Sequence, residues 1–129
     1  MRAERLRIGL MWLSGLLVVA AAFHRPPGVA ELADRAAAGD VARGRSLWQR
    51  ECCGCHGDIP GCFGPPLAFT LAAMLREQGP SFTRRYVVES IVQPEKVVRR
   101  QVQPMPWINL SDRNIVDVTA FVVDELVDR

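Results

Sequence analysis

The stretch ECCGCHG, residues 51–57, decides how the rest of this chain is interpreted. It holds three of the four cysteines in the chain and one of its two histidines. Cysteines and histidines this close together carry chemistry in proteins, and their spacing and surroundings indicate which kind.

Cys52, Cys55 and His56 form a C-x-x-C-H pattern, which is typical of covalent haem attachment. Three alternatives stay open. A zinc site needs a further pair of ligands, and only Cys62 and His24 remain among the cysteines and histidines outside this stretch. A redox dithiol of the thioredoxin kind belongs to an α/β fold, and no strand pattern is visible. Simple disulfides are the third alternative.

The N-terminus has the pattern of a membrane-targeting segment. Residues 8–23 carry no charge and follow a start with three arginines and one glutamate. Such a segment directs a chain across a bacterial inner membrane. Residues 1–23 are then either a retained anchor or a signal peptide cleaved near the three consecutive alanines, with a buried soluble helix as the remaining reading. In the first two cases the domain faces the oxidising periplasm.

Length and charge set the remaining bounds. The 129 residues fit one small domain with an appendage. The net charge of +2 is contained in the first seven residues, so the rest is formally neutral and no nucleic-acid partner is expected. We expect a signal segment over 1–23, a linker with a weakly helical end over 24–38, and the domain over 39–129.

The hydrophobic periodicity predicts a small all-α domain of about four helices. Helices are expected over 41–51 after an Asp40 cap, over 67–79, from a Ser81 cap to just before Pro94, and after a Ser111 cap. Residues 52–66 and 93–110 are rich in turn-forming residues or prolines and predict two irregular segments. The acidic residues of the last helix are expected on its solvent side: Asp117, Asp124, Glu125 and Asp128.

Four signatures follow one another along the chain: Gly44 and Trp48, then the C-x-x-C-H-G motif, then Gly64-Pro65-Pro66-Leu67, then Met105-Pro106-Trp107 before the helix start at Leu110-Ser111-Asp112. Over residues 39–127 this succession resembles the class I monohaem c-type cytochromes. The resemblance implies a small class I cytochrome c fold around one covalently bound haem c.

The resemblance also implies the haem ligands. Cys52 and Cys55 would bind the haem through thioethers, and His56 and Met105 would be the axial ligands of the iron. Met105 lies between two prolines, which stiffen the backbone that presents its sulfur.

Other residues have weaker roles in the same site. Met74, inside an expected helix, and His24, beside the membrane segment, are the alternatives to Met105 as iron ligand. Pro65 matches a proline whose carbonyl accepts a hydrogen bond from the ligating histidine, and Leu67 matches an apolar residue against the macrocycle. Trp107 either lines the haem pocket, donates to a propionate, or simply packs.

Cys53 and Cys62 depart from the simplest pattern of the family. Two additional cysteines nine positions apart are expected to form a disulfide in an oxidising compartment. Free buried thiols and a single reactive thiol are the alternatives.

The resemblance implies an electron carrier and not an enzyme, because an iron with both axial positions filled has no place for a small-molecule substrate. Redox proteins, in a respiratory or related chain, would be its donor and acceptor. We expect it on the periplasmic side of the bacterial inner membrane, anchored, or soluble in the periplasm if the segment is cleaved. The alternative is a dedicated haem subunit of a periplasmic dehydrogenase or of a sulfur-compound-oxidising complex. A sensor or peroxidase would need an open iron position.

Overall fold

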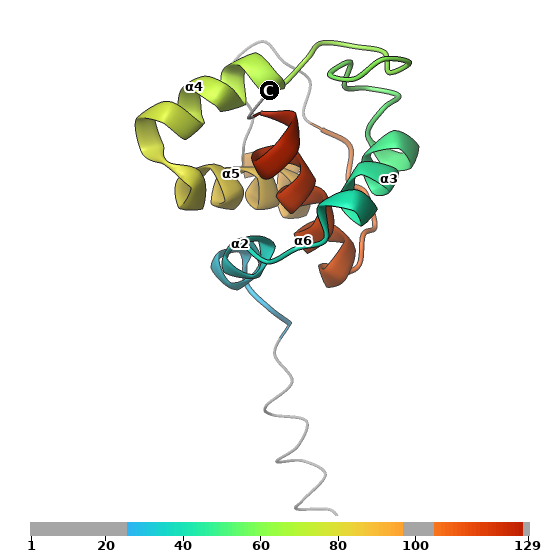
Figure 1. Cartoon of the computed structure of the whole chain (residues 1–129). Coiled ribbons are helices and arrows are strands. Elements are labelled where there is room, and N and C mark those ends of the chain that lie inside the picture. The colour runs from blue at the N-terminus through green and yellow to red at the C-terminus, as the bar shows by residue number, and fades with distance from the viewer. Residues whose placement is uncertain (1–25, 97–104, 128–129) are drawn as a thin grey trace, which may run out of the picture.

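A computed structural model describes residues 26–96 and 105–127 of the chain. All regular elements in these residues are helical, which confirms the all-α class (Figure 1). They are α2 Val29–Ala36, α3 Val41–Glu51, α4 Ala68–Gln78, α5 Pro80–Val92, the 3-10 turn η1 Pro94–Lys96, α6 Asp112–Phe121 and its π-helical extension η2 Val122–Leu126.

The predicted anchor or signal segment, residues 1–23, lies outside the described part of the chain. Within that part, no helix has both the length and the apolar character needed to cross a membrane.

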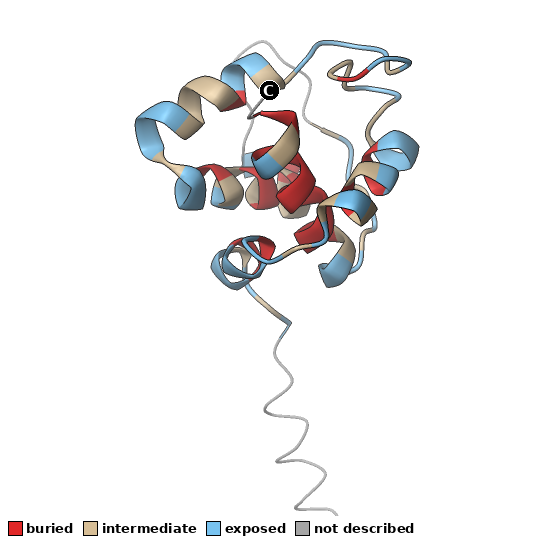
Figure 2. Ribbon diagram, viewed as in Figure 1, coloured by how far each residue is buried: buried red, intermediate tan, exposed pale blue. Residues whose placement is uncertain are grey.

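Helix α6 is the central element of the fold, and the other helices pack around it (Figure 1). Every residue from Ile115 to Phe121 is buried, so the helix is covered on all sides and not on one stripe (Figure 2). Helix α3 crosses it on one side, α2 and α5 pack together and against it, and α4 packs on α5 and η2.

The crossing of α3 and α6 is a close one. A Cβ on Gly44 would overlap the backbone oxygen of Asp117. One turn further along α3, the Trp48 ring packs on Phe121 with ring centroids 5.9 Å apart. Gly44 therefore lets the helix backbones approach, and the aromatic pair fills the space beside them.

Two of the three predicted caps are confirmed. The Asp40 carboxylate accepts from the Arg43 amide at 3.0 Å, and the Ser111 hydroxyl accepts from the Asn114 amide at 3.3 Å. The Ser81 cap is wrong, because α5 already begins at Pro80. Proline suits the first helical position, since it has no N–H to satisfy. Gly79, at φ +83°, ends α4 and leads directly into α5.

The segment expected as a linker contains a packed helix. Leu32, Ala33 and Ala36 of α2 are all buried, and α2 contacts both α5 and α6. The weakly helical end expected within 24–38 is thus a part of the core. Two of its three buried residues are alanines, so the hydrophobic face of this helix stands out only weakly in the sequence.

Asp117 was expected on the solvent side of the last helix, and this is wrong: it is only 4% exposed. Its Oδ1 accepts from the Asp40 amide at 2.9 Å, and its Oδ2 accepts from Arg43 Nη1 at 2.8 Å. The same guanidinium donates to Asn114. Burial is tolerated because both carboxylate oxygens are hydrogen-bonded and the charge is paired.

Candidate cofactor site

The residues of the C-x-x-C-H pattern are grouped by one tight turn at the end of α3. The Cys55 and His56 amides both donate to the Cys52 carbonyl, at 3.0 and 2.9 Å. The Cys52 amide in turn donates to Trp48. The turn therefore continues from the helix and gives the two thiols and the imidazole one rigid support.

The turn meets the Met105 segment at a small cavity. Its lining consists of Glu51, Cys52, Cys55, His56, Met105, Pro106 and Ile108. Two thiols, an imidazole and a thioether thus come together from segments about 50 positions apart in the sequence. The predicted attachment residues and both predicted axial ligands share this one site.

These donors fit a covalently attached haem, since they are the groups that c-type haem attachment and His/Met ligation require. The volume of the cavity, about 50 Å³, is well below the roughly 300–1,000 Å³ of pockets that enclose a cofactor. A macrocycle between them therefore requires the Met105 segment and the turn to lie farther apart than they do here.

The imidazole of His56 is half-buried and lies beside Trp48, with ring centroids 5.6 Å apart. Burial lowers the pKa of His56, while the Asp58 carboxylate and the Pro65 backbone raise it in opposition. Because proline has no N–H, the Pro65 backbone can act on the ring only through its carbonyl, as an acceptor. Nδ1 itself is buried and has no partner within strict hydrogen-bond geometry.

Cys52 and Cys55 are both free thiols. Burial raises the pKa of the Cys52 thiol to about 11, helped by the charge of Glu51 and by Cys55. The thiol is therefore protonated at neutral pH, whereas a redox-active cysteine needs a depressed pKa. This favours cofactor attachment over the redox-dithiol alternative.

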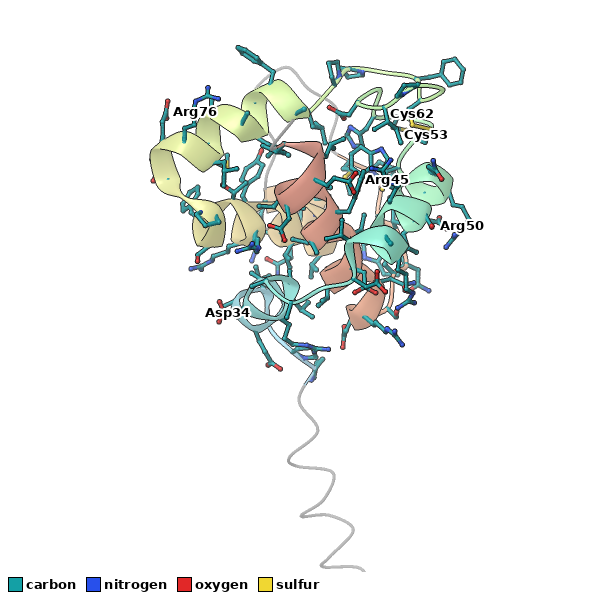
Figure 3. The ribbon with its side chains drawn as sticks, viewed as in Figure 1. Asp34, Arg45, Arg50, Cys53, Cys62 and Arg76 are labelled. Carbon is teal, nitrogen blue, oxygen red and sulfur yellow. A yellow bond between two sulfur atoms is a disulfide. The ribbon has the colours of Figure 1, made fainter. Side chains whose placement is uncertain are left out.

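Cys53 and Cys62 form a disulfide, as their proximity in the sequence predicts, with Cα atoms 4.5 Å apart (Figure 3). Next to it, the Phe63 amide donates to the Cys53 carbonyl at 2.9 Å. The disulfide and this hydrogen bond close the loop that follows the turn.

The loop then crosses back over the turn at two glycines. A Cβ on Gly57 would overlap the carbonyl oxygen of Gly64, and a Cβ on Gly64, at φ +108°, would overlap that of Cys55. No side chain fits where these two segments of the loop cross. The crossing brings Pro65, the next residue, to the side of His56.

Asp58 is a site residue that sequence reasoning missed. Its Oδ1 accepts from the amides of Leu67 and Ala68, at 2.6 and 2.7 Å. Its position directly after the C-x-x-C-H-G motif was the only signal, because its bonding partners are nine and ten residues away.

Of the remaining predicted residues, none that the structure describes lines this cavity. Leu67 is half-buried against the core, and Trp107 is 71% exposed, which excludes plain packing for its side chain. Met74 lies with Phe69 and Phe82 along a separate groove between α4 and α5, so it does not join this site. His24 lies outside the described residues.

In residues 26–96 and 105–127, no three or more His, Cys, Asp or Glu side chains are grouped so as to hold a metal ion. The zinc alternative therefore finds no ligand set in this part of the chain.

Comparisons with protein-family models, with curated proteins and with solved structures give no significant match for this chain.

Proposed function

We propose that this chain is a monohaem c-type cytochrome that carries single electrons between redox proteins. The observation that carries the proposal is the convergence of Cys52, Cys55, His56 and Met105 on one cavity. The order of motifs along the sequence, with its resemblance to class I cytochromes c, supports the same function.

Cys52 and Cys55 would attach the cofactor. Each Sγ–H would add across one vinyl group of the porphyrin, with sulfur bonding to one vinyl carbon and hydrogen to the other. The rigid turn supports this role, because it holds both sulfurs next to the imidazole of His56. Burial lowers the pKa of that imidazole and so favours its neutral form, which is the form that binds iron.

A haem held here would supply a one-electron Fe(III)/Fe(II) couple. Met105 would fill the second axial position with a thioether sulfur, which favours the ferrous state and raises the reduction potential. With His56 and Met105 both bound to iron, no small-molecule substrate can reach the metal. The chain would then exchange electrons with protein donors and acceptors and would not itself be an enzyme.

The Cys53–Cys62 disulfide supports a periplasmic location, because structural disulfides form and persist in oxidising compartments. The apolar run over residues 8–23 supports a tether to the bacterial inner membrane, with a soluble periplasmic form if this run is cleaved. Tethering would keep the carrier close to membrane-bound partners and raise its effective concentration there.

The alternative is a dedicated haem subunit of a periplasmic oxidoreductase complex. Exposed aromatic side chains favour it: Phe63 is 74% and Trp107 is 71% exposed, on the two segments that adjoin the site. Aromatic residues are enriched in protein interfaces. A native mass measurement in mild detergent discriminates, since a shuttle is released as a single chain and a subunit remains with its partners.

The direct test is covalent haem attachment. After expression with a cytochrome c maturation system, the denatured protein should carry the added mass of one haem. Cys52→Ala and Cys55→Ala should each reduce the number of thioether links by one, while Cys62→Ala should keep both. A wild-type protein that carries no covalent haem would exclude the function proposed here.

A further inference from the structure

Asp58, in the loop that precedes helix α4, caps the N-terminus of that helix. Leu67, the residue at the N-cap of α4, provides no side-chain cap of its own. The Leu67 and Ala68 amides donate instead to Asp58 Oδ1, at 2.6 and 2.7 Å. The first amides of a helix lack partners within the helix, so this carboxylate satisfies donors that would otherwise stay unpaired.

The second carboxylate oxygen of Asp58 has a different environment. Oδ2 is buried and has no hydrogen-bond partner among the described residues. A buried oxygen without a hydrogen bond lowers the stability of the folded protein. A serine at this position could cap the helix with its single oxygen and would not leave a second oxygen unpaired. The positive end of the α4 dipole compensates part of it. The carboxylate also acts electrostatically on the His56 imidazole, two residues before it.

The same bonds fix the position of Pro65. On its C-terminal side, Leu67 lies two residues after Pro65, and the Leu67 amide donates to Asp58. On the other side, Gly64 lies directly against the backbone of Cys55 and Gly57. Pro65 is therefore held from both ends next to the ring of His56.

We propose that Asp58 is a positioning residue of the cofactor site: it holds the Pro65 carbonyl toward His56 and places its carboxylate near the imidazole. This inference rests on the function proposed above. A fixed negative charge stabilises ferric iron more than ferrous iron, since the ferric ion carries one more positive charge. Asp58 would thus lower the reduction potential of a haem bound to His56 and oppose the upward bias from Met105.

Asp58→Asn in the haem-loaded protein tests the charge. Asparagine keeps a side-chain oxygen for the Leu67 and Ala68 amides but carries no charge. We expect a higher reduction potential with unchanged His/Met absorption bands. The matched control is Asp34→Asn, which removes the same charge from an exposed position on α2, at the end of the molecule opposite the Cys53–Cys62 disulfide (Figure 3). Its potential should equal that of the wild type.

Asp58→Ala separates positioning from charge. It removes both the charge and the acceptor, so amide hydrogen exchange at Leu67 and Ala68 should be faster than in Asp58→Asn. Equal exchange in the two variants would overturn the positioning role.

The other outcomes are equally decisive. A potential in Asp58→Asn equal to that of Asp34→Asn would overturn the charge role while leaving the proposed function intact. If Asp58→Asn does not load haem, Asp58→Glu replaces it: loading with a near wild-type potential would support the need for a carboxylate, and failure to load would overturn the charge role. A wild type without covalent haem would remove both the proposed function and this inference.

Discussion

Asp117 shows how a single carboxylate joins two helices. It accepts from the Asp40 amide at the start of α3 and from the Arg43 side chain one turn later. Both bonds fall beside the close approach of Gly44 to α6. The carboxylate thus fixes the N-terminal end of α3, while Trp48 and Phe121 fix the end that leads into the candidate site.

We predict that Asp117→Ala lowers the free energy of unfolding by about 2–3 kcal/mol, because it leaves the Asp40 amide and Arg43 without a charged acceptor. Asp112→Ala, an exposed position in the first turn of the same helix, should cost less than about 1 kcal/mol. Urea unfolding followed by circular dichroism measures both. Equal losses in the two variants would show that the buried pair contributes nothing specific.

Single residues also mark where sequence reasoning stops. The grouping of Cys52, Cys55, His56 and Met105 was predictable because their spacing and neighbours are themselves the signal, and the structure brings them together. Asp58 and Asp117 were not. Their roles depend on partners across a loop or on another helix, and nothing in the neighbouring sequence indicates those partners.

At the scale of elements, the loop after α3 is held together by several independent contacts. They are the Cys53–Cys62 disulfide, the Phe63–Cys53 hydrogen bond, the crossing of Gly57 and Gly64, and the bonds of Asp58 to the start of α4. Together they give an irregular segment the rigidity that the proposed role of His56 as a ligand would need.

We predict that replacing both Cys53 and Cys62 with serine destabilises the protein by roughly 2–3 kcal/mol, as expected from the loss of a short covalent loop. The comparison is made in the same haem state, with wild type and variant each unfolded with and without reductant. Reductant should destabilise the wild type and leave the double variant unchanged. If the two proteins unfold at the same urea concentration without reductant, the other contacts alone hold the loop.

The element boundaries show the limits of local patterns. Asp40 and Ser111 were identifiable as caps because each is a capping residue that directly precedes a helical pattern. The start of α5 was misplaced by two residues, because Gly79 and Pro80 join two helices without the loop that a Ser81 cap assumed. Helix α2 was taken for the end of a linker, because alanines give only a weak hydrophobic face.

At the scale of the whole molecule, helix α2 makes the core larger than the predicted domain over 39–129. It covers α5 and α6 at the end of the molecule opposite the disulfide loop (Figures 1 and 3). Helix α2 therefore packs on the side of the core away from the candidate site (Figure 3).

We predict that Leu32→Ala destabilises the protein by about 2–4 kcal/mol, because the side chain is 2% exposed and its removal leaves a cavity between α2 and the core. Glu31→Ala, at an exposed position on the same helix, should change stability by less than about 0.5 kcal/mol. Thermal unfolding of the two variants provides the measurement. A Leu32→Ala protein as stable as Glu31→Ala would mean that α2 behaves as the linker the sequence suggested.

The central claim is that His56 and Met105 hold one haem between them, and the optical spectrum tests it most directly. The oxidised protein, matured with haem, should show the weak long-wavelength band of sulfur-to-iron charge transfer. Met105→Ala should lose that band while keeping covalent haem, and Met74→Ala should retain it. A wild-type spectrum without the band would contradict the account, because the sixth position of the iron would then be open or filled by another group.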